Sequence, residues 1–428
     1  MGNRIAVVGA GYVGLTSGAC LSHLGHDVTC IESDPAKVEM LREGRIPISE
    51  PGLAEIVQEG LDNGRLRFTG DMASGVADRE FVLLCVPTPQ AEDGSADLSF
   101  ITRAASDLSK HIPSGGIVIN KSTVPLGSTH IVADAINRDD VHVVSNPEFL
   151  REGHAVSDFL HPERVVIGAD DTDIAVRVAG LHLRLAAPVL ATDPTSAELI
   201  KYASNAFLAT KLSFMNSIAS LAERAGADIA DVVLGIGMDH RIGSNFLQPG
   251  PGWGGSCLPK DTSALVHISQ TFGYDFSLLQ SVIDTNQKQF ELVVEKVREV
   301  LEVPLDGAQI AVWGLTFKAN TDDVRASPAV EVIKRLQQAG AVIKAYDPGL
   351  SATSTRMLDG IDVATDPYDC VKDAQALVVL TEWPEFASMD LDRVAAQMTS
   401  LGVVDTRMML DRAALERRGF RFRGIGRT

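Results

Sequence analysis

The stretch from 245 to 262, NFLQPGPGWGGSCLPKDT, places one nucleophile in flexible backbone. Its prolines and glycines disfavour both helix and strand, so we expect a loop. Cys257 stands just before a predicted helix that starts at Pro259 and has Asp261 in its first turn. A helix N-terminus and Lys260 both favour a thiolate. Cys257 is therefore a candidate nucleophile. The alternative is a small buried residue in a structural turn.

A second motif with chemical meaning is GAGYVG at 9–14, between a predicted strand from Arg4 to Val8 and a helical run to Leu24. The glycines of GxGxxG permit a tight turn, close approach to a pyrophosphate and packing of helix on strand. The next strand ends at Glu32, where an acid accepts the ribose hydroxyls and repels a 2′-phosphate, so NAD is favoured over NADP. Lys37 is a candidate for the adenosine end, or else a solvated surface lysine.

Three further predicted strands, Phe81 to Val86, Gly116 to Asn120 and Val141 to Ser145, each end in a polar cluster. Ligands of open α/β sheets bind outside the carboxyl ends of strands. Thr88 and Thr123, in two of these clusters, are either functional or turn residues.

The third cluster, NPEFLREG, carries Glu148 and Glu152, which would share a face on a helical turn. One carboxylate near a catalytic thiol could orient or activate a water, whereas the alternative is an exposed acidic turn.

A long helix is predicted from Pro194 to about Ala227, because no Gly or Pro interrupts the pattern between its first residue and Gly226. Such helices bridge domains or pair with a partner subunit. Lys201 and Asn205 lie one turn apart on it and could meet a substrate at a domain junction, or else belong to a solvated face.

A second α/β region starts near Pro304, with a strand from Gln309 to Trp313 and a helix from Pro328 to Gln338. It has no GxGxxG, so a different phosphorylated ligand is expected, with Lys318 and Arg325 as anion contacts. We therefore predict an α/β protein with two Rossmann-like doubly wound domains joined by a long central helix. The predicted boundaries are 1–193, 194–303 and 304–428.

Composition narrows the function classes. The net charge is −18 and the pI is about 5.0, which argues against general binding of nucleic acid or membrane surfaces. The five cysteines are scattered without metal-binding spacing, so we expect no metal site and reduced thiols in the cytoplasm. Neither a signal peptide nor an apolar stretch of membrane-spanning length is visible.

Taken together, the motifs resemble the UDP-glucose/GDP-mannose dehydrogenase family. The resemblance runs nearly end to end, through GAGYVGL at 9–15, KSTVPLG at 121–127, NPEFLREG at 146–153, KYASNAFLATKLSFMN at 201–216, GPGWGGSCLPKD at 250–261 and GLTFKANTDDVRASPA at 314–329. Ser217, Trp253 and Leu258 depart from the usual pattern. Leu258 also occurs in GDP-mannose dehydrogenases, which weakens the choice of sugar nucleotide. The UDP-N-acetylhexosamine dehydrogenases typically have an isoleucine-proline and no lysine after this cysteine, so SCLPKD at 256–261 argues against them.

The resemblance implies a four-electron oxidation of a sugar C6 alcohol to a carboxylate by two NAD in succession. The substrate that it implies first is UDP-glucose. The alternatives are GDP-mannose as substrate, or a non-catalytic binder of NAD and a nucleotide sugar. A homodimer is also implied, in which Arg241 reaches the partner's substrate. The implied catalytic residues are Cys257, Lys201, Asn205, Asp261, Thr123, Glu148 and Glu152.

The implied ligand contacts fall into two groups. Those for NAD are Gly9, Gly11, Tyr12, Val13, Gly14, Glu32, Lys37, Thr88, Thr123, Glu152, Lys260 and Arg325. Those for the UDP-sugar are Glu148, Phe149, Leu150, Arg151, Glu152, Lys201, Asn205, Arg241, Phe246, Leu247, Gly250, Gly254, Phe317 and Lys318.

Overall fold

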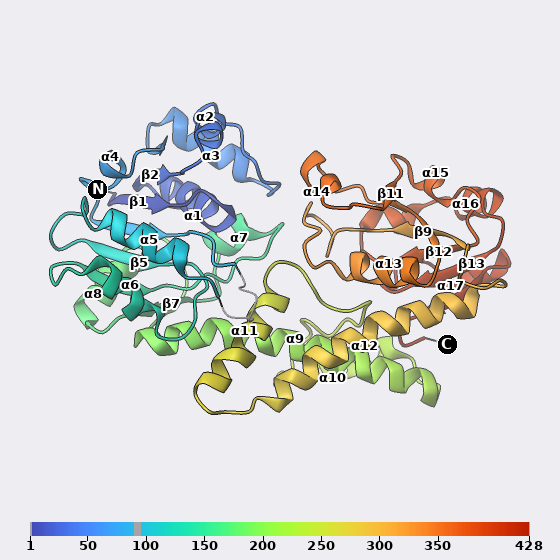
Figure 1. Ribbon diagram of the computed structural model, residues 1–428. Helices are drawn as coiled ribbons and strands as arrows, with labels where there is room; N and C mark the ends of the chain where they lie inside the picture. Colours follow the sequence, from blue (N-terminus) through green and yellow to red (C-terminus); the bar gives the residue numbers. More distant parts are fainter. Residues whose placement is uncertain (1, 90–95, 428) are drawn as a thin grey trace. The chain divides into compact units, whose positions relative to one another are not determined.

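The computed structural model describes residues 2–89 and 96–427 (Figure 1). The chain folds into two compact units. The first unit extends to Ser204 and the second starts at Asn205. The long helix α9, Pro194–Ala225, begins in the first unit and ends in the second. Among the described helices, none is both long and apolar enough to cross a membrane.

The first unit is built on an eight-stranded sheet with the order β3-β2-β1-β4-β5-β6-β7-β8. All neighbouring strands pair in parallel except β6 and β7, which are antiparallel. The strands are β1 Arg4–Val8, β2 Asp27–Ile31, β3 Leu66–Thr69, β4 Phe81–Leu84, β5 Ile117–Asn120, β6 His142–Ser145, β7 Val165–Gly168 and β8 Val189–Thr192.

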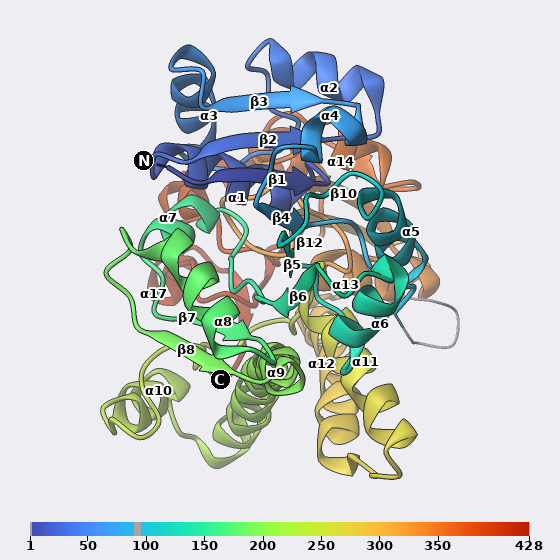
Figure 2. The same cartoon turned by 90° about the vertical axis from the view of Figure 1, so that its left-hand side faces the viewer.

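Helices cover both faces of this sheet, with α5 and α6 on one side and α7 and α8 on the other (Figure 2). The cause is visible in β1, where Ile5 and Val7 pack toward α1 while Ala6 and Val8 pack toward α5. The helices of the unit are α1 Tyr12–His23, α2 Pro35–Arg42, α3 Leu53–Asp62, α4 Met72–Val76, α5 Ser99–Leu108, α6 Ser128–Ile136, α7 Ala155–Leu160 and α8 Thr172–Ala179, followed by the 3₁₀ turn η1 Gly180–His182.

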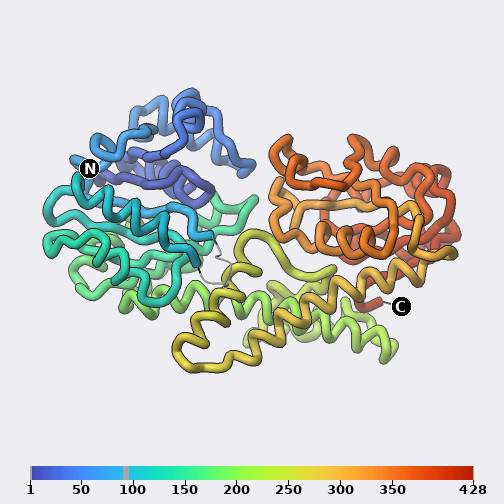
Figure 3. Tube along the Cα trace, in the orientation of Figure 1, coloured from blue at the N-terminus to red at the C-terminus, as the bar shows by residue number. Residues whose placement is uncertain are grey.

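The second unit repeats the doubly wound plan with six parallel strands in the order β11-β10-β9-β12-β13-β14. The strands are β9 Gln309–Trp313, β10 Val342–Tyr346, β11 Asp362–Val363, β12 Ala376–Val379, β13 Gly402–Asp405 and β14 Arg421–Gly424. The course of the chain through them can be followed in Figure 3.

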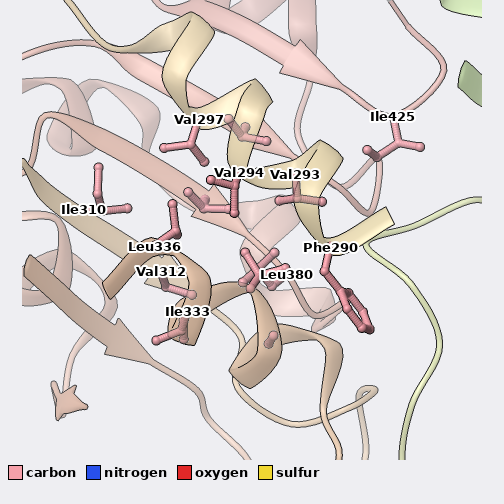
Figure 4. Close-up of a cluster of buried hydrophobic side chains, with 14 of the residues drawn as sticks. Phe290, Val293, Val294, Val297, Ile310, Val312, Ile333, Leu336, Leu380 and Ile425 are labelled. Atoms are coloured by element: carbon pink, nitrogen blue, oxygen red, sulfur yellow. The ribbon is translucent and has the colours of Figure 1, made fainter. Parts of the chain in front are cut away.

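Helices of the second unit pack on both faces of its sheet. Figure 4 shows Phe290, Val293 and Val297 of α12 meeting side chains of β9 and α13 in one apolar cluster. The other face is covered by α15, α16 and α17. The helices are α10 Ile229–Gly237, α11 Leu258–Thr271, α12 Ser277–Val300, α13 Pro328–Gln338, α14 Ala352–Arg356, α15 Pro367–Val371, α16 Leu391–Gln397 and α17 Arg412–Arg417, with a 3₁₀ turn η2 at Pro384–Ser388.

The predicted fold class, two Rossmann-like domains with a long central helix, is confirmed. Several predicted boundaries differ by one or two residues, and two of these differences have a clear consequence or cause. β4 ends at Leu84 instead of Val86, because Pro87 has no N–H with which to extend the ladder. Helix α11 begins at Leu258, one residue before Pro259, so that Cys257 is its N-cap residue.

Candidate active site

The glycine loop between β1 and α1 has the geometry expected for dinucleotide binding. Gly9 has φ +94°, and a Cβ there would lie 2.7 Å from the carbonyl oxygen of Cys85. A Cβ on Gly14 would lie 1.8 Å from the Gly9 oxygen, so only glycine allows the helix this close. A Cβ on Gly11 would meet no described atom within 4 Å, so there is open space at Gly11 that would allow a pyrophosphate to approach closely.

Tyr12 and Val13, the other two expected cofactor residues of this loop, open α1. The Tyr12 hydroxyl is hydrogen-bonded to Glu50, and burial together with that carboxylate raises the Tyr12 pKa far above its usual value. Tyr12 is therefore a neutral donor at any pH of interest.

Glu32 follows β2 directly, where the sequence places the ribose-binding acid. Its Oε1 accepts the N–H groups of Ser33, at 2.8 Å, and Asp34, at 3.2 Å. Lys37 Nζ lies 3.0 Å from its Oε2. Burial raises the pKa of Glu32, but Lys37 and the two N–H groups outweigh burial, so the net pKa lies below its ordinary value. Glu32 is therefore ionised at neutral pH, and the structure places Lys37 beside it.

The structure brings Thr88 and Thr123 together, from the segments that follow β4 and β5. The Thr88 hydroxyl donates to the carbonyl oxygen of Thr123 at 2.8 Å. The Thr123 segment is held further by Glu198 of α9, which accepts the N–H of Gly127 at 2.6 Å and the N–H of Thr129 at 2.8 Å. Two predicted strand-end residues thus lie at one edge of the sheet.

Glu148 and Lys201 form a buried ion pair, with Lys201 Nζ 2.8 Å from Glu148 Oε1. The other carboxylate oxygen accepts the N–H of Leu150 at 2.7 Å. Burial raises the pKa of Glu148, but the nearby Lys201, the Leu150 N–H and Lys121 together lower it below its ordinary value. A carboxylate and an ammonium group, both nearly inaccessible to solvent, are therefore held in contact on the first unit.

The expected helical pairing of Glu148 with Glu152 is wrong. Residues 146–151 form no helix, because Glu148 turns inward to Lys201 and Gly153 has the left-handed φ of +78°. Glu148 is buried, whereas Glu152 is partly exposed and acts electrostatically on Tyr12.

The side chains of Phe149 and Arg151, two expected substrate contacts, have partners in the first unit. The Arg164 guanidinium lies 3.7 Å from the centroid of the Phe149 ring, and Lys201 Nζ lies 5.6 Å from it. Arg151 forms an ion pair with Asp158, at 2.6 Å.

Lys121 was not among the expected site residues, although it follows β5 directly. It is buried, and its Nζ donates to Asn146 Oδ1 at 3.1 Å. Burial lowers the pKa of Lys121, with Lys201 acting in the same direction and Glu148 opposing. The sequence alone did not identify Lys121 as a site residue, because an isolated lysine is most often solvated.

Cys257 is exposed, whereas the other four cysteines, Cys20, Cys30, Cys85 and Cys370, are buried. It is the N-cap residue of α11, and its Sγ lies 3.7 Å from the Ser256 hydroxyl. The alternative of a small buried residue in a turn is therefore wrong for Cys257. An accessible thiol at the positive end of a fourteen-residue helix has the surroundings of a reactive cysteine.

Asp261 lies one turn beyond Cys257 on α11, is only 1% exposed and is held from both sides. Asn205 Nδ2 donates to its Oδ2 at 2.6 Å, and Lys260 Nζ to its Oδ1 at 2.6 Å. Three expected site residues, Asn205, Lys260 and Asp261, thus form one hydrogen-bonded chain beside the thiol helix. On α9, Asn205 follows Lys201 by one turn.

The loop before Cys257 is fixed by buried amide side chains. The Gly250 N–H donates to Asn216 Oδ1, and its carbonyl accepts from Gln289, each at 2.8 Å. Asn286 bonds both the N–H and the carbonyl of Trp253. Asn286 and Gln289 of α12 were not predicted, because only the tertiary structure brings α12 to the loop.

The remaining expected residues of this loop region differ in their surroundings. Leu247 is buried, Phe246 has φ +61° and is partly buried, and a Cβ on Gly254 would lie 2.1 Å from the Ala326 oxygen. Arg241 is exposed and pairs with Asp239.

The GLTFK segment after β9 is organised by Asp347, whose Oδ2 accepts the N–H groups of Leu315, at 2.7 Å, and Thr316, at 2.9 Å. Lys318 Nζ lies 5.3 Å from the centroid of the Phe317 ring. Arg325 pairs with Asp323 of its own segment, at 2.7 Å.

Arg407, which sequence reasoning missed, also lies at this end of the second sheet. Its guanidinium donates to the Leu380 carbonyl at 3.0 Å and lies 3.2 Å from Glu382. A Cβ on Gly250 would meet it at 3.0 Å. Only the fold brings it to Gly250.

Known proteins match the chain over its full length. Residues 3–186 match the NAD binding domain, 195–288 the central domain and 311–412 the UDP binding domain of the UDP-glucose/GDP-mannose dehydrogenase family. The chain belongs to the UDP-glucose/GDP-mannose dehydrogenase family.

Individual members of this family are similar to this chain over nearly its whole length. The UDP-glucose 6-dehydrogenase of Rhizobium meliloti (strain 1021) is 44% identical over 99% of both chains. UDP-glucose 6-dehydrogenase TuaD of Bacillus subtilis (strain 168) is 42% identical over 99% of this chain and 93% of its own. The solved structure of a UDP-glucose dehydrogenase from Pyrobaculum islandicum has a TM-score of 0.93 at 36% identity, over 100% of this chain and 98% of that one.

Family membership identifies NAD as the cofactor of the first unit, in agreement with the glycine loop and the ionised Glu32. It also places Lys318 and Arg407 inside the UDP binding domain, and Lys201, Asn205, Cys257 and Asp261 inside the central domain.

Proposed function

We propose that this protein oxidises the C6 alcohol of UDP-glucose to a carboxylate, giving UDP-glucuronate, with two equivalents of NAD. One observation carries the proposal. The N-terminal end of α11 holds both an exposed thiol, Cys257, and a buried carboxylate, Asp261, to which Asn205 donates a hydrogen bond. The similar proteins of Rhizobium and Bacillus named above support the choice of UDP-glucose.

The first oxidation removes a proton from the C6 hydroxyl while NAD, when bound, accepts the hydride. Asp261 is the proposed proton acceptor, through a water or with Lys201. Asn205, within 2.6 Å of Asp261, keeps the carboxylate in one orientation. Lys201 and Asn205 donate to the developing oxyanion.

In the second oxidation the Cys257 thiolate adds to the aldehyde carbon, and the carbonyl oxygen takes up a proton to give a thiohemiacetal. The thiohemiacetal then loses its hydroxyl proton and a hydride, which a second NAD would accept when bound, and becomes a thioester. Water then adds to the thioester carbonyl, the carbon–sulfur bond breaks, and the carboxylate leaves with Cys257 restored. Thr123 with Glu148 or Glu152 is proposed to orient this water. A binder without catalysis would need no accessible thiol at a helix N-terminus.

We further propose two sets of ligand contacts. Those for NAD are Gly9, Gly11, Tyr12, Val13, Gly14, Glu32, Lys37, Thr88, Thr123, Glu152, Lys260 and Arg325. Those for UDP-glucose are Glu148, Phe149, Leu150, Arg151, Glu152, Lys201, Asn205, Arg241, Phe246, Leu247, Gly250, Gly254, Phe317 and Lys318. The division into 1–193, 194–303 and 304–428 is supported by the three family matches. A cytoplasmic location is supported by the five cysteines, which form no disulfide.

A homodimer is proposed from the surface of α9. Phe207, Phe214 and Leu221 are spaced by seven residues and are 66%, 57% and 60% exposed. A stripe of this length is rarely left in water, and a second copy of the same helix would cover it. Arg241, exposed beside α10, is then proposed to reach the partner's substrate.

Counting the NADH formed from a limiting amount of nucleotide sugar tests the proposal. We expect two NADH for each UDP-glucose and no comparable turnover with GDP-mannose. One NADH per sugar would contradict the four-electron oxidation, faster turnover of GDP-mannose would favour that substrate, and no NADH with either sugar would favour a binding protein.

A further inference from the structure

Glu50 is a buried carboxylate between α2 and α3 that has no role in the chemistry described above. Its Oε1 accepts the N–H of Ala155 at 2.7 Å, and its Oε2 accepts the N–H of Gly153 at 2.7 Å. The same Oε2 accepts the hydroxyl of Tyr12, which itself lies 3.2 Å from the Gly153 nitrogen. Three donors from two distant segments therefore converge on one side chain.

Both segments belong to the proposed site. Tyr12 directly follows Gly11 of the glycine loop, and Gly153 directly follows Glu152. Gly153 has φ +78°, so the two hydrogen bonds to Glu50 fix a left-handed turn immediately after Glu152. Burial and Glu50 raise the pKa of Tyr12 most, and the negative charge of Glu152 raises it further.

A purely structural role at the start of α7 would not require a carboxylate from a distant segment such as Glu50. Helix α7 has His154 as its N-cap residue, and that side chain makes no cap hydrogen bond. A local Ser or Asp would satisfy the N–H groups at this end of α7. Here the acceptor comes from more than a hundred residues away and also binds Tyr12. The arrangement fixes the glycine loop and the Glu152 turn together.

We propose that Glu50 is a positioning residue that holds Glu152, through Gly153 and Tyr12, in the orientation needed to direct water onto the Cys257 thioester. The role rests on the proposed function. Glu50 itself contacts neither cofactor nor substrate in this scheme, so its loss should slow hydrolysis of the thioester more than either hydride transfer.

Glu50→Gln is the sharpest variant, because it keeps the size of the side chain. Glutamine has one acceptor oxygen and an NH₂ group that cannot accept, so at least one of the three donors loses its partner. A displacement of about 1 Å at a group that orients a reactant costs up to about a hundredfold in rate. We expect turnover to fall roughly tenfold to a hundredfold.

The readout is a rapid-mixing experiment with excess NAD and UDP-glucose. We expect Glu50→Gln to release a burst of about two NADH per subunit, followed by a slow steady state. Mass spectrometry of the acid-quenched protein should show the acyl group on the peptide that contains Cys257. Glu50→Asp, whose carboxylate is retracted by one carbon, should show the same pattern with a smaller loss, and it serves if Glu50→Gln fails to fold.

Glu223→Gln is the matched control. Glu223 also accepts a backbone N–H, from Gly426 at 2.6 Å, and pairs with Lys296 at 2.8 Å, and the described bonds of its side chain include no expected site residue. It should lose stability without producing a burst or an acyl group.

Three results would overturn the role of Glu50: unchanged turnover in Glu50→Gln, slower turnover without a burst or acyl group, or an equal burst in the control. If the unmodified protein itself forms no NADH, the proposed function is wrong, and the positioning role of Glu50, which rests on it, is wrong as well.

Discussion

Asn205 donates a 2.6 Å hydrogen bond to Asp261, and the acceptor carboxylate is 99% shielded from solvent. Asp261 is also bonded to Lys260, so each of its oxygens has a positively polarised partner. A buried carboxylate satisfied in this way keeps one orientation, which a group that accepts a proton from substrate requires.

Asp261→Asn tests this relationship. The substitution preserves shape but removes the charge, and it leaves Asn205 and Lys260 without a carboxylate acceptor. We expect kcat to fall by about a hundredfold or more while KM for UDP-glucose changes little. Asp284→Asn, on the exposed side of α12, is the control and should retain full turnover. Turnover of Asp261→Asn within threefold of the unmodified protein would contradict the proposed role.

The Glu148–Lys201 pair predicts a pH dependence of stability. The pKa of Glu148 is lower in the folded chain than its ordinary value of 4.5. The ionised carboxylate therefore stabilises the fold above about pH 4.5, and this contribution is lost as the pH falls through the folded pKa. Glu148→Gln should lower Tm most near neutral pH, where the buried Lys201 loses the negative charge of Glu148, and the difference should shrink below pH 4.

Thermal unfolding of both proteins from pH 3 to pH 8 checks this expectation. Glu55→Gln, at an exposed position on α3, controls for the general loss of one acidic charge. A Tm difference that stays constant across the range would mean that Glu148 is not ionised in the folded protein.

Glu32 predicts the cofactor preference. Its carboxylate is held by Ser33, Asp34 and Lys37 and is ionised at neutral pH, so a 2′-phosphate would meet a fixed negative charge. We expect kcat/KM for NAD to exceed that for NADP by about a hundredfold or more, equivalent to roughly 3 kcal/mol. Glu32→Gln should reduce the ratio of kcat/KM for NAD to kcat/KM for NADP, mainly by raising kcat/KM for NADP. Preference of the unmodified protein for NADP would refute this interpretation.

The dimer proposal predicts complementation between inactive chains. If Arg241 serves the partner's substrate, Arg241→Ala and Cys257→Ala chains are each inactive, but their mixed dimer contains one site with both residues. Mixing them under conditions of verified subunit exchange should restore part of the activity, up to about a quarter of that of the unmodified protein for random pairing. No recovery would mean that Arg241 acts within its own chain.

Local sequence was sufficient for the features that depend on short-range geometry. The strand, glycine loop and helix from Arg4 onward, the long helix α9 and the loop before Cys257 all follow from spacing and backbone preference, and each is present. The second sheet was predicted for the same reason, since its strands are continuous apolar runs.

Contacts between distant segments could not be predicted. Glu50, Lys121 and Arg407 act through partners that lie 25 or more residues away, and a single sequence gives no sign of such pairs. The error at Glu148 and Glu152 has the same origin. The four-residue spacing suited a helix, but the buried Lys201 and the left-handed Gly153 determine the backbone there.

The central claim is that Cys257 is the covalent nucleophile of the second oxidation, and Cys257→Ala tests it most directly. The variant should fold and bind NAD and UDP-glucose with affinities close to those of the unmodified protein, because neither contact requires sulfur. Its steady-state formation of UDP-glucuronate should fall by several orders of magnitude, while a slow first hydride transfer survives. Cys257→Ser should rescue poorly, since an alcohol is a much weaker nucleophile near neutral pH. Formation of UDP-glucuronate by folded Cys257→Ala at nearly the unmodified rate would contradict the account.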